Sequence, residues 1–329
     1  MSLDFTQSWF KEVQLNVHSK GNALQRYFSK RFRALLSGNP EGVPPWLGAV
    51  EASDEAGLYL PDEAPWIAHA DMATLVGGIR ALLMQALHPG SLTGVREYSR
   101  YKDDPLGRLS GTVRWLTVTT FASTESVSSE AGRVNRMHGH VKGNYRDASG
   151  KIVSYSAADP HLLRWVHIAF MDSFLRCHQT YSTVPLPGGA DAYIRLWSKS
   201  VIPLGLDDAP MSEAEMLDDF ERYRPELAVT EETREVIGWI KNPPLPRSSL
   251  PAYRFLFKAA LASLPRDYQE LIGLGYPSLR VTRPMTVYLL KFIRLAIGPE
   301  SPIEEAAIDR LHRAGQMKNG QVVSRGIVS

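Results

Sequence analysis

The apolar residues of this chain recur mostly at helical spacing rather than in strict alternation, which predicts an all-α fold. One stretch departs from this pattern, because residues 143–156 hold two short alternating runs around Asp147-Ala-Ser-Gly150 and predict a β-hairpin. We expect helices over residues 5–18, 23–36, 69–87, 91–101, 105–122, 124–141, 160–181, 231–241, 252–264, 279–297 and 303–314, with one that ends at 200 and one that begins after 212.

Capping signals fix two of these helix starts and bear on domain organisation. Asp159-Pro160 places a cap before a first-turn proline, and Ser212-Glu-Ala-Glu215 has the spacing of a capping box. The proline-rich stretch 242–251 is the best linker candidate, but the 78 residues after it need the rest of the chain to bury their apolar faces. We therefore predict one helical domain over 1–329, with its core over about 60–185, helices of about 186–315 packed on it, and a polar tail over 316–329.

Composition and charge exclude several classes of protein. The 37 Lys and Arg residues nearly balance 35 Asp and Glu, so nothing electrostatic favours a nucleic-acid partner. The one basic excess, from Lys20 to Arg33, is read as the solvated face of a helix, with weak contact to an anionic membrane surface as the alternative. Cys177 is the only cysteine, which excludes an intrachain disulfide and Cys-ligated zinc or iron–sulfur clusters.

The chain offers no secretory signal and no run of about 18 apolar residues that would span a bilayer. We therefore expect a cytoplasmic protein without a transmembrane segment.

Among nine histidines, His167 has the most telling setting. On a helix, Leu163, Phe170, Met171 and Phe174 share its face. An imidazole in such an apolar stripe must be hydrogen-bonded or coordinated, because burying it without a partner costs a few kcal/mol. Two interpretations remain open at this point: a core histidine bonded to a backbone carbonyl, or an axial ligand of a haem iron.

The preceding helix carries a polar stripe that includes Arg133 and Arg136 and ends with His138-Gly-His140. Two histidines two residues apart diverge by about 200° on a helix, so they share a zinc ion only if the helix ends there. The Glu-x-x-His spacing of di-iron helical bundles is absent from the sequence, which argues against a ferritin-like oxygenase.

Four pieces in order resemble the family of latex-clearing rubber oxygenases and fungal mpaB-type endoplasmic-reticulum oxygenases. The resemblance extends over about 75–181 and is weaker beyond. The matching pieces are Arg80-Ala-Leu-Leu-Met-Gln-Ala-Leu-His-Pro-Gly90, Asp104-Pro-Leu-Gly-Arg108, Arg133-Val-Asn-Arg-Met-His138 and Tyr155-Ser-Ala-Ala-Asp-Pro-His-Leu-Leu-Arg-Trp-Val-His167.

This resemblance implies a globin-like helical core that holds one haem b, with His167 as the proximal ligand and Arg164 as the family's arginine three residues before it. Arg133 matches the arginine of the distal helix, whereas Arg136 stands where rubber oxygenases have a lysine that reaches the iron. An arginine stays protonated and cannot ligate iron. His138 is therefore the better distal candidate, either as a hydrogen-bond donor to bound dioxygen or as a second ligand.

Arg80, His88 and Arg108 are also motif positions in the resembling family. For each of the three we weigh pairing with a haem propionate against an ordinary role, which is a surface or capping role for the arginines and a helix-ending role for His88. The function implied is a haem-dependent oxygenase that acts with dioxygen on an apolar small molecule such as a lipid or isoprenoid. The alternative is a non-catalytic haem protein, a sensor or a haem store.

Overall fold

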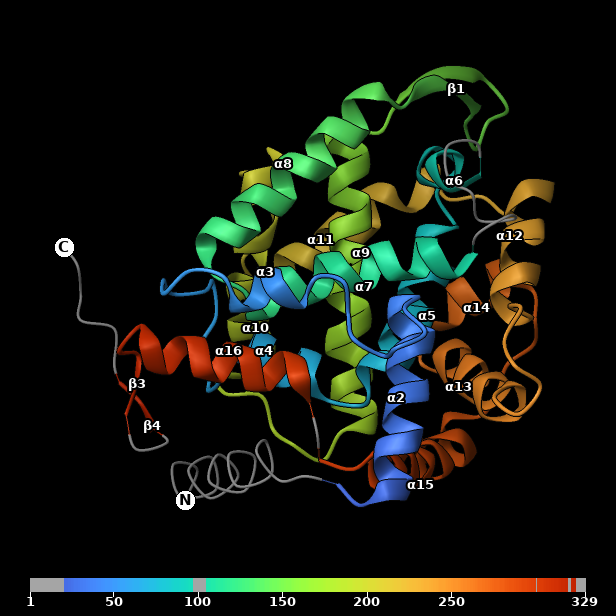
Figure 1. Cartoon of the computed structure of the whole chain (residues 1–329). Helices are drawn as coiled ribbons and strands as arrows, with labels where there is room; N and C mark the ends of the chain where they lie inside the picture. The colour runs from blue at the N-terminus through green and yellow to red at the C-terminus, as the bar shows by residue number, and fades with distance from the viewer. Residues whose placement is uncertain (1–20, 97–104, 300, 319–320, 324–329) are drawn as a thin grey trace. The chain divides into compact units, whose positions relative to one another are not determined.

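The computed structural model describes residues 21–96, 105–299, 301–318 and 321–323, and within them it confirms the all-α prediction. This part of the chain forms fifteen α-helices, α2 to α16, and two small antiparallel sheets (Figure 1). The helix predicted over 5–18 lies outside the described residues. The globin-like character of the core stays a prediction.

Contacts between α-carbons divide the chain into two compact units. The first takes the described residues up to Ala70, those of 106–131 and those from Lys291 onward, and the second takes 71–105 and 132–290. The proline-rich stretch 242–251 lies inside the second unit and does not separate the two. The single-domain prediction stays a prediction.

The first unit is built around a core of tryptophan, phenylalanine and aliphatic side chains. Among them, the rings of Trp66 and Phe121 meet edge to face, with centroids 4.8 Å apart. Its elements are α2 (Ala23–Ser37), α3 (Leu47–Glu51), α4 (Ala64–Ala70), most of α7 (Pro105–Phe121), the start of α8 (Thr124–His140), the end of α15 (Leu279–Ile297), α16 (Pro302–Arg313) and the strands β3 (Met317–Lys318) and β4 (Gln321–Val322).

The second unit contains the longest helix, α9 (Pro160–Tyr181), and the elements that pack around it. Helix α9 starts as predicted, because the Asp159 side chain accepts a hydrogen bond from the His161 N–H at 2.9 Å. The other elements are α5 (Thr74–Gln85), α6 (Pro89–Arg96), the end of α8, β1 (Lys142–Arg146), β2 (Ile152–Ser156), α10 (Gly189–Trp197), α11 (Glu213–Tyr223), α12 (Glu231–Lys241), α13 (Leu250–Ala262), α14 (Arg266–Ile272), most of α15, and the 3-10 turns η1 (Ser198–Ser200), η2 (Ile202–Leu204) and η3 (Arg224–Glu226).

Helices α5 and α6 pack closely against α9 because each has a glycine that leaves room for a side chain of α9. A Cβ atom at Gly77 would lie 2.7 Å from the ring of Phe174, and one at Gly90 would lie 2.9 Å from a methyl of Leu162. Real Cβ atoms do not come this close to their neighbours. The contacts of α5 and α6 with α9 therefore depend on the absence of a side chain at Gly77 and Gly90, respectively.

The long apolar helix predicted over 69–87 is confirmed as α5 over Thr74–Gln85, but its predicted start is wrong, because the chain leaves the helix between Ala70 and Thr74. The Asp71 carboxylate accepts a hydrogen bond from the Ala73 N–H at 2.7 Å and another from the Ser182 hydroxyl at 2.7 Å. A short polar side chain that bonds nearby backbone competes with helical hydrogen bonds, and hydrophobic periodicity does not register this effect.

Smaller differences concern the loops and the tail. Helix α3 lies in a stretch expected to be a loop, α14 was not predicted, α6 begins at Pro89 instead of Ser91, and β3 and β4 pair within the expected tail. The predicted hairpin is confirmed, with Gly143 opposite Tyr155 and a turn in which Asp147 accepts hydrogen bonds from the backbone of Ser149 and Lys151.

No single helix among the described residues has both the length and the apolar composition needed to cross a bilayer. Helices α4 and α5 meet those criteria only when counted together across their break.

Candidate functional site

His167 lies in the middle of α9 with only 5% of its surface exposed. Its Nε2 atom is buried and has no hydrogen-bond partner among the described residues. Burial, together with a smaller contribution from the nearby charge of Arg164, lowers the pKa of His167 to about 3. The ring is therefore neutral near pH 7, and its Nε2 is an orphaned polar atom in an apolar setting.

The face of α9 around His167 is the apolar stripe that the sequence predicts. Met171 and Phe174 are buried, and the rings of Phe170 and Phe174 meet edge to face with centroids 5.9 Å apart. A neutral imidazole among such side chains, with one nitrogen free, is the setting in which a proximal histidine grips haem iron. The alternative, a core histidine bonded to a backbone carbonyl, leaves the Nε2 atom unexplained, because no described carbonyl accepts from it.

Arg164, one turn before His167, is held by two carboxylates. Its Nε donates to Asp219 at 2.8 Å and its Nη1 lies 2.7 Å from Asp208. Asp219 lies in α11 and is almost fully buried, and Asp208 lies in the loop before α11, so these two ion pairs link α9 to α11 and to that loop. The role predicted for Arg164 in cofactor binding stays a prediction, because its charge is already balanced inside the protein.

Arg80 is buried in α5 and has a complete set of internal partners. Its Nη2 pairs with Asp172 at 2.6 Å, and its Nη1 donates to Ser173 at 2.8 Å. On α9, Asp172 and Ser173 point at least about 120° away from His167. The structure therefore places the Arg80 guanidinium away from the His167 face. The side chain of Arg108, the other propionate candidate, lies outside the described residues.

Helix α8 separates the three distal candidates. His138 continues the inner face marked by buried Val134, and its Nδ1 is buried without a partner among the described residues. Burial also lowers the pKa of His138. Arg136 is exposed and Arg133 is half-buried. They diverge from His138 by about 200° and 140° around the helix, so the structure does not bring either arginine to its side.

The His138–His140 pair does not form a zinc site. Helix α8 continues through His140, so the two rings point to different sides, and His140 is exposed. Although α8 ends at His140, both histidines lie within the helix, so its geometry keeps their two rings apart.

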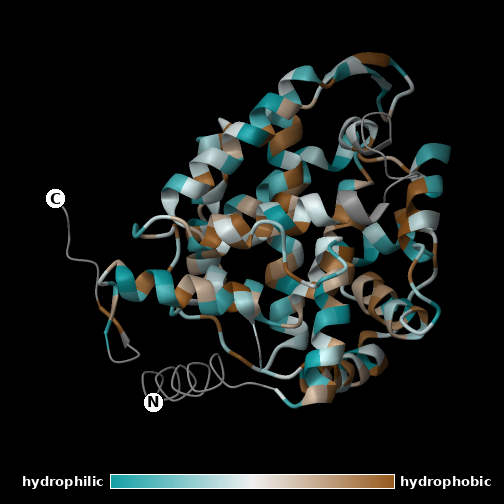
Figure 2. Ribbon diagram, viewed as in Figure 1, coloured by the Kyte–Doolittle hydropathy of each residue, from teal (hydrophilic) through white to brown (hydrophobic). Residues whose placement is uncertain are grey.

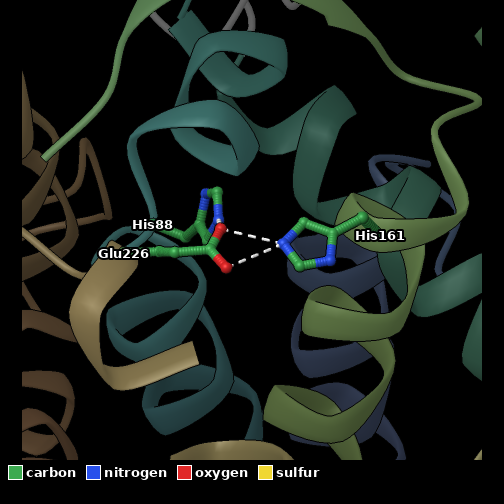
Figure 3. A group of neighbouring side chains, drawn as sticks. All are labelled: His88, His161 and Glu226. Carbon is green, nitrogen blue, oxygen red and sulfur yellow. Dashed lines mark hydrogen bonds and ion pairs between the residues drawn. The ribbon is translucent and has the colours of Figure 1, made fainter. Parts of the chain in front are cut away.

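A polar cluster that the sequence did not reveal joins His88, His161 and Glu226 (Figure 3). His88 follows α5, His161 is in the first turn of α9, and Glu226 is in η3. The Glu226 carboxylate is hydrogen-bonded to His161 Nε2 at 2.8 Å and to His88 Nε2 at 3.1 Å. The ligand atoms of the three residues lie within 4.8 Å of one another, a spacing at which they could hold a metal ion.

Hydrogen bonds around His88 favour a hydrogen bond from its ring to Glu226 over a bound metal ion in the polar cluster. The Nδ1 atom of His88 accepts the Gly90 N–H at 3.1 Å, so the ring proton belongs on Nε2, where it is donated to Glu226. A metal on Nε2 would move that proton to Nδ1 and set it against the Gly90 N–H. Burial of His88 also lowers its pKa, which keeps the ring neutral. No sequence signal links His161 to Glu226, because they are 65 residues apart.

An all-α fold with an orphaned histidine nitrogen on its longest helix defines a helical protein with a candidate haem or metal site. The family of catalytic domains described as ER-bound oxygenase mpaB/B'/Rubber oxygenase matches residues 66–295, and the chain belongs to this family. Its members are oxygenase catalytic domains by description, and an oxygenase needs a metal, haem or other means of activating dioxygen. No curated protein and no solved structure matches the chain.

Proposed function

We propose that this protein is a haem b-dependent oxygenase in which His167 holds the iron through Nε2. The observation that carries the proposal is the neutral, buried and unpartnered Nε2 of His167. A ligand bond to this nitrogen would satisfy the one polar atom that the surrounding apolar side chains leave bare. Membership of an oxygenase family supplies the reaction class.

Haem b bound at His167 would supply the activation of dioxygen. His167 contributes a lone pair that stays available down to low pH, because burial keeps its ring neutral. Arg164 is a positioning residue, because its bonds to Asp219 and Asp208 fix α9 one turn before His167, the proposed iron ligand. The apolar side chains beside His167 exclude water and suit an apolar substrate such as a lipid or isoprenoid.

His138 is the proposed acid–base or hydrogen-bonding residue of the distal side. It lies on the inner face of α8, and its unpartnered Nδ1 can hold or accept a proton. Arg133 and Arg136 carry no such support from the structure, so their proposed catalytic role rests on the family resemblance alone.

The test of this proposal is the optical spectrum of the freshly expressed protein. We expect a Soret band in the wild type, its loss in His167→Gly, and its return when imidazole is added to that variant. His140→Gly removes an exposed histidine of α8 and should leave the band unchanged. A wild type without a Soret band, or an unchanged band in His167→Gly, overturns the proposal.

A second candidate function is a non-catalytic haem sensor or store. It is favoured by one observation, that His138 and His167 each leave a buried ring nitrogen unpartnered and so could both ligate iron. This arrangement predicts a six-coordinate low-spin spectrum that His138→Ala converts to five-coordinate, with no consumption of dioxygen beside apolar substrates. Dioxygen consumption that depends on His138 favours the oxygenase instead.

A further inference from the structure

Helix α15 has a row of large apolar side chains that no described part of the chain covers. Phe292 and Leu295 are 66% and 69% exposed, and the same face carries Val281, Met285 and Tyr288 nearer the start of the helix. The spacing of four and three residues places all five within one narrow arc. The opposite side of α15 is buried, at Thr282, Thr286, Leu290 and Ile297. The helix therefore packs through that side and leaves its row of large apolar side chains exposed.

Helix α2 adds a second exposed apolar row in the same unit as the end of α15. Leu24, Tyr27 and Phe28 are about half exposed or more, and their spacing puts them on one face. The two helices touch, because the Gln25 side-chain amide donates to the Leu295 carbonyl at 2.9 Å. In this unit, the α2 row and the end of α15, with Phe292 and Leu295, therefore form one exposed surface, which we call the α2–α15 patch; Figures 1 and 2 show the two helices.

The two helices that carry the patch are rich in cations although the whole chain is nearly neutral. Neither helix contains an acidic residue, and each contains four cations. Without these eight cations, the rest of the chain has fewer Lys and Arg residues than its 35 Asp and Glu residues, out of 37 Lys and Arg in all. The cations are Arg26, Lys30, Arg31 and Arg33 on α2, and Arg280, Arg283, Lys291 and Arg294 on α15.

Several of these cations are exposed on the part of the two helices that carries the patch, whereas Arg33 donates to the Gly42 carbonyl and Arg283 to the Thr180 carbonyl. Arg31 stacks over the ring of Tyr27 and donates to its hydroxyl at 2.8 Å, which presents its charge beside an exposed aromatic. Lys30 is paired with Glu41 in an exposed bridge, which contributes little stability and exchanges readily. Lys291 is exposed beside Phe292 and forms no hydrogen bond or ion pair with any described residue.

We propose that the α2–α15 patch docks onto the surface of a bilayer that contains anionic lipids. Aromatic and aliphatic side chains flanked by lysine and arginine are the composition of helices that lie in the membrane interface. A second copy of this chain fits the patch less well, because a two-fold contact would set cations against cations. The bilayer supplies both the apolar medium and the negative charge that the patch lacks.

The test is co-sedimentation of the full chain with vesicles of phosphatidylcholine, with and without phosphatidylserine. We expect binding to the vesicles that contain phosphatidylserine, and weakening of this binding by salt. Phe292→Ser with Leu295→Ser should reduce the apparent affinity about tenfold or more, and Lys291→Glu about tenfold. All three sites are exposed, so folding should be unaffected.

Matched controls lie on other surfaces of the chain. Ile152→Ser removes an equally exposed apolar side chain from the hairpin, and Lys258→Glu reverses an exposed charge on α13. Both should bind vesicles as the wild type does. Equal binding by the patch variants and the controls overturns the proposal, as does absence of binding to anionic vesicles.

Light scattering after gel filtration tests the other occupant of the patch, a second copy of the chain. A dimer in the wild type that Phe292→Ser with Leu295→Ser converts to a monomer would assign the patch to self-association and overturn the membrane proposal. Since vesicle binding needs no cofactor, its outcome is independent of whether the protein carries haem.

Discussion

Replacing His167 by leucine in the haem-free protein should flatten the dependence of stability on pH. The pKa of His167 falls from 6.5 in the unfolded chain to about 3 in the folded protein, because burial penalises the charged ring. Below pH 6.5 the unfolded chain therefore takes up a proton that the folded protein does not. Stability is fully present above about pH 6.5 and is lost as the pH falls toward about 3.

The size of the effect follows from the two pKa values. At pH 5, protonation of an unfolded-state histidine with a pKa of 6.5 stabilises the unfolded chain by about 2 kcal/mol, and at pH 7.5 by roughly 0.1 kcal/mol. Between these two pH values, the wild type should therefore lose about 2 kcal/mol more than His167→Leu. The comparison uses the change with pH, so any packing difference of the leucine cancels.

Urea unfolding followed by circular dichroism at several pH values measures this difference. His140→Leu is the control, because it replaces an exposed histidine of α8 and so shows how the loss of a histidine that is not buried changes the dependence of stability on pH. If the wild type and His167→Leu lose stability in parallel as the pH falls, His167 is not held neutral by burial. That outcome would refute the claim that His167 has a buried, unpartnered Nε2, on which the haem proposal depends.

Three further predictions concern packing and charge in the second unit. Gly77→Ala should cost about 1–3 kcal/mol through its clash with Phe174, whereas Gly78→Ala, where a Cβ meets nothing within 4 Å, should be neutral or stabilising; equal thermal shifts would contradict the packing argument. Asp172→Ala should cost about 3–5 kcal/mol by leaving Arg80 charged and buried without its partner, and the double variant with Arg80→Met should recover part of that loss in urea titrations. Zinc ions should not raise the melting temperature through the polar cluster; a rise that vanishes when its glutamate becomes glutamine would show that the proton assignment is wrong.

The sequence by itself determined the local elements near the candidate site. Helix α9 begins at Pro160 and ends at Tyr181 as predicted, because a cap, a first-turn proline and an apolar period are all short-range signals. The hairpin followed from alternation and turn residues for the same reason. The apolar setting of His167 could be read from its own helix, since residues three and four apart share a face.

Only the tertiary structure decided which polar groups have partners. The ion pair of Arg80 with Asp172 and the bond of His161 to Glu226 join residues 92 and 65 positions apart, and no spacing rule reaches so far. The same holds for the break at Asp71, which bonds to Ser182 across the fold. Whether the Nε2 of His167 is free depends on every chain segment packed around it, and the three-dimensional arrangement of those segments leaves it bare.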